Sequence, residues 1–429
     1  MTMQRNLDEL KADQSWSFAD LTRTQTRYIS HGYHTYPAKF IPQLAARLIR
    51  EFSSVGDTVV DPFVGSGTTA IETLLQARRA VGVDINPVAC LIARVKATPL
   101  QPQPLAQEFD CLERDLAQMN GGAHASAAGL HAIIPANARI DYWFPKEQKE
   151  RLGAILGRIS AVQDKDRREF FLVAFSQTLK ACSIWLQKSI KPTRDPSKQP
   201  AEPLAAFLRQ SRWMLKHNRE FWDLVPVQVR DALADFRTIE CSDARKLPCQ
   251  DGGASLIVTS PPYVTSYEYA DLHQLTALWL EYFESLPEFR KRFIGSGASG
   301  RPAIELKSQR AVQICEELAD GKRGREVRDY FADMLECFQE MRRVLKPGGT
   351  ACIVIGNTAL QEVQIENAQV FLEQMQNIGF KTRDIIKREI PSKILPQTRD
   401  PHNGRFTTSS DTNRVQAYPV EYILVMEKN

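Results

Sequence analysis

The stretch Asp57–Thr69, DTVVDPFVGSGTT, decides which fold this chain of 429 residues can adopt. Its first half is short, apolar and β-branched, which is typical of a buried parallel strand. Gly65 and Gly67 then form a turn that opens a helix at Thr68, and glycine lets the backbone pass close to a ligand without a Cβ in the way. The stretch therefore predicts a strand, a tight turn and a helix N-terminus that faces a bound molecule.

The same alternation of apolar strands and helices continues along the chain. Near the C-terminus, two predicted strands follow one another with no helix between them, so they are most simply antiparallel neighbours. The pattern predicts an α/β fold with a doubly wound sheet, mostly parallel, closed by an antiparallel C-terminal strand. We expect strands at 57–63, 80–85, 238–244, 255–260, 350–356, 380–390 and 420–426, helices at 68–78, 87–97, 327–345 and 368–378, and a turn at Lys346–Gly349.

Composition limits the class of protein. Hydrophobic residues make up 43% and charged residues 25% of the chain, and the net charge is only +4, which is ordinary for a soluble globular protein. The polar N-terminus predicts no signal peptide, and no apolar run reaches the roughly 18 residues of a membrane span. The eight cysteines form no CxxC pair, so we expect no metal site and no disulfides. A cytoplasmic protein is the expectation.

Acidic residues stand at the ends of three neighbouring predicted strands: Asp61, Asp84 and Asp243. The carboxyl ends of such strands meet in one crevice. There Asp84 can accept both hydroxyls of a ribose, and Asp243 can accept from an adenine amino group. No Lys follows Gly67 as in a nucleotide P-loop, and the third glycine of the dinucleotide motif is missing. The alternative is that each acid only caps the following helix.

The motif DPFVGSGTT, Asp61–Thr69, resembles the binding motif for S-adenosyl-L-methionine (AdoMet) in bacterial amino-methylating DNA methyltransferases. His34–Pro42, HTYPAKFIP, resembles the further cofactor motif of that family, although its aromatic residues could also simply anchor the N-terminal segment on the core. The resemblance implies an AdoMet methyltransferase sheet and AdoMet as cofactor. It implies a cofactor site made of Lys39, Phe40, Asp61, Phe63, Gly65, Gly67, Thr68, Asp84 and Asp243.

A second motif, Thr259–Tyr263 with the sequence TSPPY, follows the fourth predicted strand. Consecutive prolines fix the backbone and remove two N–H donors, so this turn presents carbonyls and side chains. That suits an exocyclic amino group, whose hydrogens Ser260 and the Pro261 carbonyl could accept while its lone pair faces the methyl donor. Tyr263 offers a face for stacking on a base flipped out of the duplex. We therefore expect Ser260, Pro261, Pro262 and Tyr263 to be catalytic.

Ser260 bears on the substrate. Family members that methylate adenine usually carry Asp or Asn at this position, whereas Ser is similar to the N4-cytosine enzymes. The resemblance therefore implies a site-specific N4-cytosine DNA methyltransferase, with an N6-adenine enzyme as the alternative. An RNA methyltransferase and a DNA-binding protein without catalysis are weaker alternatives. Many N4-cytosine enzymes have the two motifs in the opposite order, so the location of target recognition stays open.

Roughly 140 residues separate the second and third predicted strands, far more than an ordinary connection. We expect helices within them and divide the chain into a cofactor-binding half, 1–98, a helical insertion, 99–236, and a catalytic half, 237–429, with basic loops at 287–325 and 391–419. Double-stranded DNA is the expected partner, with a cognate restriction endonuclease and a role in restriction-modification or defence. Three basic clusters could contact DNA: Lys188–Arg219, Arg290–Arg310 and Lys393–Arg414.

Overall fold

The computed structural model of the protein describes residues 7–37, 39, 41–120, 131–189, 191–264, 269–295, 304–318, 321–390 and 420–429, and the backbone of 398–399 and 415–416. Among the helices of these residues, none combines the length and the apolar character that crossing a membrane requires.

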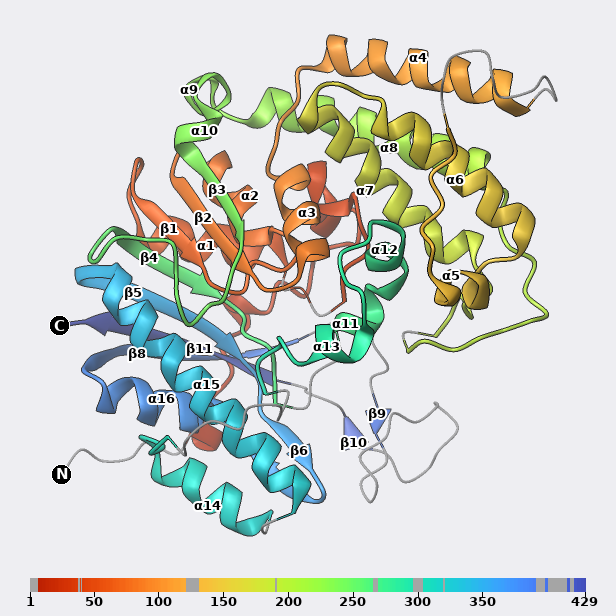
Figure 1. The fold of residues 1–429 in the computed structure, drawn as a ribbon. Coiled ribbons are helices and arrows are strands. Elements are labelled where there is room, and N and C mark those ends of the chain that lie inside the picture. Colours follow the sequence, from red (N-terminus) through yellow and green to blue (C-terminus); the bar gives the residue numbers. More distant parts are fainter. Residues whose placement is uncertain are drawn as a thin grey trace.

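Seven strands of the described chain form one sheet in the order β3-β2-β1-β4-β5-β11-β8 (Figure 1). β11 runs antiparallel to both of its neighbours, and the other pairs are parallel. The predicted fold class is confirmed, and the antiparallel C-terminal strand lies between β5 and β8. The strands are β1 Thr58–Asp61, β2 Arg79–Asp84, β3 Arg237–Cys241, β4 Ala254–Thr259, β5 Leu345–Ile355, β8 Phe380–Glu389 and β11 Val420–Lys428.

Helices cover both faces of the sheet. Because side chains alternate along a strand, Val59 packs toward α1 (Pro42–Phe52), while its neighbour Val60 packs toward α15 (Lys322–Val344). The remaining helices around the sheet are α2 Thr68–Leu75 and α3 Pro87–Lys96 on the side of α1, and α16 Asn367–Asn377 and α14 Gln309–Glu317 on the side of α15; short 3₁₀ turns η1 Leu7–Glu9, η2 Gln14–Trp16, η3 Gln25–Arg27 and η4 Ile29–Gly32 precede α1.

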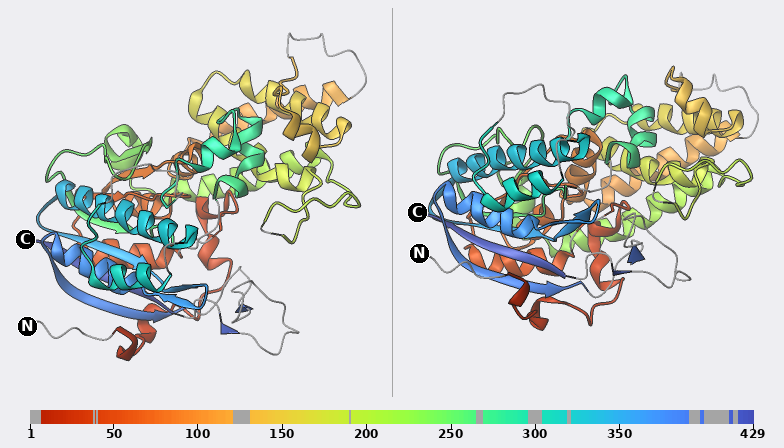
Figure 2. Two further views of the ribbon diagram at one scale, coloured as in Figure 1. Left: turned by 60° about the horizontal axis from the view of Figure 1, so that its bottom comes forward. Right: turned by 90° about the horizontal axis from the view of Figure 1, so that it is seen from below.

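The long connection between β2 and β3 is helical and builds its own apolar core. Phe170, Phe171, Phe175 and Phe207 are fully buried in it, and this core packs on the outer side of α3. Figures 1 and 2 show five of these helices standing to one side of the sheet: α4 Pro102–Asn120, α5 Ala138–Trp143, α6 Lys146–Ser160, α7 Lys165–Cys182 and α8 Pro203–Leu224. The two short helices that follow, α9 Val227–Asp231 and α10 Leu233–Phe236, lie beside β3 in Figure 1.

The prediction that the basic segment 287–325 is a loop was wrong, because this segment contains the end of α13 (Leu286–Arg290), α14 and the start of α15. Ala311 and Ile314, three residues apart on α14, are fully buried among residues of α15 and α16, and the surrounding Gly, Lys and Arg concealed this short pattern. Lys346–Gly349 falls within the bounds of β5, but the register with β4 jumps across it and Gly348 has a φ of 73°, so the chain does turn there.

The hairpin of β6 (Thr358–Leu360) and β7 (Val363–Ile365) was not predicted. Its two-residue turn puts Gln361 and Glu362 at positive φ, a geometry that usually carries Asn or Gly. The segment 391–419 lies mostly outside the described residues, and two short strands, β9 (Thr398–Arg399) and β10 (Val415–Gln416), pair within it.

Candidate active site

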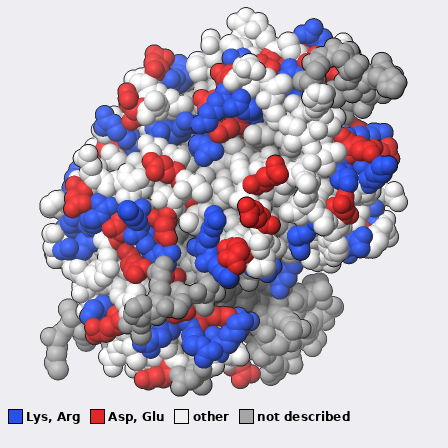
Figure 3. All heavy atoms as spheres, viewed as in Figure 1, with Lys and Arg blue, Asp and Glu red and all other residues white. Residues whose placement is uncertain are grey.

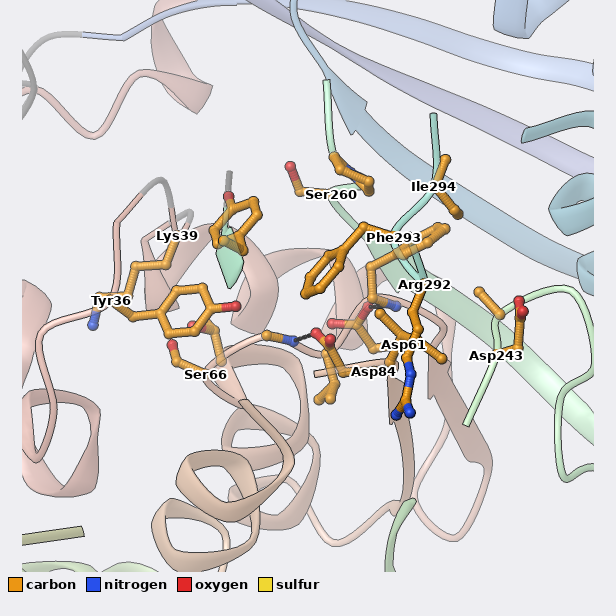
Figure 4. Close-up of a pocket in the computed structure, with 18 residues that line it drawn as sticks. Tyr36, Lys39, Asp61, Ser66, Asp84, Asp243, Ser260, Arg292, Phe293 and Ile294 are labelled. Carbon is orange, nitrogen blue, oxygen red and sulfur yellow. Dashed lines mark hydrogen bonds between the residues drawn. The ribbon is translucent and has the colours of Figure 1, made fainter. Parts of the chain in front are cut away.

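A pocket of about 870 Å³, part of it open to solvent, lies at the carboxyl edge of the parallel strands. In Figure 4, Tyr36 and Lys39 lie at one end, Asp243 lies at the other, and Asp61 and Asp84 lie between them. This is the crevice in which doubly wound sheets bind ligands. The lining residues are Tyr36, Lys39, Asp61, Phe63, Val64, Gly65, Ser66, Thr68, Asp84, Ile85, Asp243, Ala244, Ser260, Pro262, Tyr269, Arg292, Phe293 and Ile294.

Asp61 joins the two sequence motifs. It ends β1 and is 3% exposed. Its Oδ1 accepts hydrogen bonds from the Thr259 hydroxyl at 2.6 Å and from the Phe63 N–H at 3.1 Å. Burial raises the pKa of Asp61 to about 6, although the Thr259 hydrogen bond acts to lower it. Since β1 and β4 are neighbours in the sheet, this contact brings the TSPPY turn beside the glycine turn.

Asp84 ends β2 and lies within the pocket. Its Oδ2 accepts from the Gly65 N–H at 3.0 Å and its Oδ1 accepts from the Asn86 N–H at 2.9 Å. Burial raises its pKa to about 6. A carboxylate has about four acceptor positions, so these two hydrogen bonds hold the group while leaving capacity for a ligand. The carboxylate is positioned by both flanking turns.

Asp243 lines the far end of the pocket and is held by an arginine that sequence reasoning did not single out. The Arg245 guanidinium donates from Nε to Oδ1 at 2.9 Å and from Nη2 to Oδ2 at 2.6 Å. Its Nη1 also donates to Asp333 Oδ1 on α15, at 2.7 Å. The backbone N–H of Arg245 also donates to Oδ1, at 2.9 Å, so Arg245 fixes the orientation of Asp243 through its backbone and its guanidinium.

The two glycines of the turn act differently. Gly65 lines the pocket, with φ of 48°. Gly67, which was expected to approach the ligand, is not among the lining residues. Its φ is 87°, and an added Cβ would lie 3.0 Å from the Ala93 Cα on α3. Gly67 is therefore required by backbone conformation and by the close packing of α2 on α3.

The N-terminal motif supplies the other end of the pocket. Tyr36 stacks on Tyr269, with 5.8 Å between the ring centroids. Lys39 lines the pocket, and its Nζ donates to the His31 carbonyl at 2.9 Å. Burial lowers the pKa of Lys39 to about 8. Phe40, the second residue predicted from this motif, lies outside the described residues.

Only part of the TSPPY turn lines the pocket. Ser260 and Pro262 line the pocket, and Pro261 is buried beside them. Tyr263 does not line it. A Cβ added at Gly356, just after β5, would lie 3.2 Å from the Tyr263 Cε2, so the tyrosine ring lies over the backbone at that strand end. The absence of a side chain at position 356 makes room for it.

A segment that sequence reasoning treated as a basic loop closes the pocket. Arg292, Phe293 and Ile294 all line it, and Figure 4 shows them between Ser260 and Asp243. The Gly295 N–H donates to Asp333 Oδ2 at 3.1 Å, which fastens the segment to α15. The sequence did contain a signal for this role. Phe293 and Ile294 are apolar, and two successive apolar side chains are unusual in a solvated basic loop.

Tyr330 of α15 is a positioning residue for the TSPPY turn. It is 2% exposed, and its hydroxyl donates to the Pro262 carbonyl at 2.7 Å. Its side chain also lies against Gly295, where a Cβ would be 3.1 Å from the Tyr330 Cβ. One buried tyrosine thus supports both the proline turn and the segment that closes the pocket.

For the AdoMet-dependent methyl transfer that the sequence motifs imply, we expect Tyr330→Phe to lower kcat about tenfold and to leave the Kd for AdoMet nearly unchanged. Without the hydroxyl, the Pro262 carbonyl loses its partner and the turn relaxes, at a cost of roughly 1–3 kcal/mol. Methyl transfer at saturating AdoMet and equilibrium binding measure the two effects. Tyr422→Phe is the control, because it removes another buried hydroxyl, 3.5 Å from the Leu7 carbonyl. Equal loss of kcat in both variants would contradict the positioning role.

A family model described as DNA methylase, of the N6 and N4 methyltransferases, matches residues 3–95 and 254–429, more than half of the chain. The unmatched stretch holds helices α4–α10 and β3. The Type II methyltransferase M.MvaI of Kocuria varians is 25% identical over 427 residues, which cover 93% of each chain.

Two further comparisons cover less. The Type II methyltransferase M.MjaII of Methanocaldococcus jannaschii is 39% identical over 95 residues, 22% of this chain and 18% of that one. The solved structure of TTHA0409, a putative DNA modification methylase from Thermus thermophilus complexed with AdoMet, is 18% identical with a TM-score of 0.22. This match covers 44% of this chain and 53% of that one, about half its length.

Proposed function

Since the chain belongs to the family of N6 and N4 DNA methylases, with AdoMet as cofactor and DNA as substrate, we propose that it methylates the exocyclic N4 of cytosine in a specific DNA sequence. One observation carries the proposal: Ser260 lines the same pocket as the strand-end carboxylates Asp61 and Asp84. Ser260 presents a neutral hydroxyl where adenine-methylating relatives usually present an amide or a carboxylate. N6-adenine is the second candidate, because the family includes both activities.

The order of groups along the pocket suits an extended AdoMet. Lys39 would hold the carboxylate of its methionine end, Asp84 would accept the ribose hydroxyls, and Asp243 would accept from the adenine amino group. This order agrees with the row of labelled side chains in Figure 4. The bound cofactor supplies a methyl group on a positively charged sulfur. Phe63 and Ile85 add apolar surface around it, and Gly65 and Thr68 bring the helix N-terminus close.

The TSPPY turn would orient the amino group of the target. The Pro262 carbonyl is engaged by Tyr330, so the Pro261 carbonyl and the Ser260 hydroxyl are the proposed acceptors for the two amino hydrogens. The nitrogen lone pair then points at the methyl group. A nitrogen–carbon bond forms as the sulfur–carbon bond breaks, and the methylated amino group afterwards loses a proton to water. The target base would be flipped out of the duplex and would stack on Tyr263.

We also propose a division of labour along the chain. Residues 1–98 and 237–429 would bind AdoMet and carry out methyl transfer, and the helical insertion 99–236 would contact DNA. A restriction-modification or related defence role, with a cognate endonuclease as partner, is supported by the similarity to a Type II methyltransferase along 93% of the chain.

Nucleoside analysis tests the target atom. We expect label from [methyl-³H]AdoMet to appear in N4-methylcytosine after incubation with unmethylated duplex DNA, and none to appear in tRNA. Ser260→Ala should reduce the label because one acceptor for the amino hydrogens is removed. Label found only in N6-methyladenine would replace the proposal by the second candidate, and label found only in tRNA would exclude both.

A further inference from the structure

Residues 184–189 and 191–198, which we call the basic hairpin, connect α7 to α8. The Leu186 N–H donates to the Thr193 carbonyl and the Asp195 N–H donates to the Ile184 carbonyl, both at 2.8 Å. Lys198 ties the two ends of the hairpin together, since its Nζ donates to the Lys180 and Trp185 carbonyls at 2.8 and 2.7 Å. The geometry of the hairpin is therefore set by its own hydrogen bonds.

Three cations project from this hairpin into solvent: Lys188, Lys191 and Arg194 are all exposed. Within the described residues, no carboxylate lies at salt-bridge distance from any of them. The carboxylate of Asp195, their acidic neighbour in the hairpin, instead accepts from the N–H and hydroxyl of Ser197 at 3.1 and 2.6 Å. The described part of the chain thus places no acidic partner on these three cations.

Cations in the second basic cluster behave differently. Arg290 pairs with Asp271, Lys307 with Glu305, and Arg310 with both Glu317 and Glu366. Over much of the face drawn in Figure 3, basic and acidic side chains lie next to one another in the same way. Two basic clusters can therefore be compared, the hairpin and the cluster that follows the TSPPY turn. Of these two, the hairpin has positive charge that is unpaired within the described residues, as an anionic partner needs.

An exposed aromatic side chain accompanies the cations. Tyr142 of α5 is 47% exposed, and the Arg194 guanidinium lies 4.8 Å from its ring centroid. An arginine held over an aromatic ring keeps its charge while losing freedom of movement, so binding a phosphate costs less ordering. A cation beside an exposed aromatic ring suits a nucleic acid, which offers both phosphates and bases, more than a small inorganic anion.

The hairpin is rigidly connected to the wall of the active-site pocket. Trp185 stacks on Trp143 of α5 with 5.1 Å between centroids, and Trp143 Nε1 donates to the Gln274 side chain at 3.2 Å. Gln274 is fully buried and begins α12 (Gln274–Trp279), directly after α11 (Tyr269–Leu272), whose Tyr269 lines the pocket. In Figure 1 the hairpin and the β9–β10 pair lie on the same side of the molecule.

We propose that the basic hairpin is the surface by which the helical insertion binds the DNA backbone, with Lys188, Lys191 and Arg194 contacting phosphates beside the active-site pocket. The proposal rests on DNA being the substrate, and it does not depend on which base is methylated. Phosphate contacts position the duplex without reading its sequence, so the hairpin would set where the duplex lies relative to the TSPPY turn.

The salt dependence of DNA binding tests this surface. Binding of the full chain to linear plasmid DNA is measured at a series of KCl concentrations, with S-adenosyl-L-homocysteine present. Each phosphate contact contributes about 0.9 to the slope of log K against log salt. The triple variant Lys188→Gln, Lys191→Gln, Arg194→Gln should therefore lower the slope by roughly 2–3 and leave the Kd for AdoMet unchanged.

A matched control removes the same charge at the opposite edge of the sheet. Arg79, Lys381 and Arg383 are exposed near the amino ends of β2 and β8, and their replacement by Gln should leave the slope as in the unaltered protein. An unchanged slope in the hairpin variant, or an equal fall in the control, overturns the proposal. So does a fall seen with tRNA but not with DNA. A methyl group found on adenine would refute the proposed target base. It would not affect the comparison of salt slopes between the hairpin variant and the control variant.

Discussion

Replacing Tyr263 by alanine is expected to lower kcat by about 10²-fold and to leave the Kd for AdoMet within about twofold of its original value. Stacking on an aromatic ring stabilises an unstacked base by roughly 1–3 kcal/mol, and a misplaced reactant loses up to about 10²-fold in rate. AdoMet binding should be spared because Tyr263 is not among the residues that line the cofactor pocket. Single-turnover methylation and equilibrium AdoMet binding measure the two quantities.

Two further variants define the role of the ring. Tyr263→Phe keeps the aromatic face, so its kcat should remain within about tenfold of the unaltered enzyme. Gly356→Ala leaves Tyr263 in the chain but places a methyl group 3.2 Å from its Cε2, and should lower kcat by displacing the ring. Equal losses in kcat and in AdoMet affinity for Tyr263→Ala would mean that this tyrosine belongs to the cofactor site.

Asp84→Asn should raise the Kd for AdoMet by about 10²-fold and lower kcat much less at saturating AdoMet. Hydrogen bonds to a charged group contribute roughly 1.5–3 kcal/mol each, and about 1.4 kcal/mol corresponds to a factor of ten in affinity. The amide has one acceptor oxygen instead of two, so it can no longer serve Gly65, Asn86 and both ribose hydroxyls. Isothermal titration of AdoMet into the protein measures the change.

Asp57→Asn is the control for Asp84→Asn. Asp57 also accepts two hydrogen bonds, from the Ser54 N–H at 2.8 Å and from the Ser255 hydroxyl at 2.7 Å. It precedes β1 and so lies at the opposite edge of the sheet from the pocket. Its replacement should affect thermal stability without changing AdoMet affinity. Unchanged affinity in Asp84→Asn would refute the ribose role.

The pH dependence of AdoMet binding gives a second measurement on the same carboxylate. The ionised form accepts both ribose hydroxyls, and burial raises the pKa of Asp84 to about 6. AdoMet affinity should therefore fall as the pH is lowered through about 6, where protonation replaces an acceptor by a donor. Asp61 titrates in the same range, so Asp84→Asn should weaken this pH dependence without abolishing it.

Contiguous stretches of sequence determined the sheet and the chemistry of its turns. DTVVDPFVGSGTT and TSPPY each encode a strand and the turn after it within a few residues, and local β-branching, glycine and proline act over that distance. Parallel strands then bring their carboxyl ends to one edge, so Asp61, Asp84 and Asp243 were predicted to meet in one crevice. They line one pocket, together with Ser260. The site roles assigned to them stay predictions.

Only the tertiary structure decided which distant residues support that pocket. Thr259 donates to Asp61 from 198 positions away. From α15, Tyr330 donates to the Pro262 carbonyl and Asp333 accepts from the Gly295 N–H. It also decided that the hairpin cations lie without carboxylate partners among the described residues, while most of the second cluster is paired. Such contacts follow from how helices pack on the sheet, and packing depends on the shapes of many side chains at once, so no short sequence pattern encodes it.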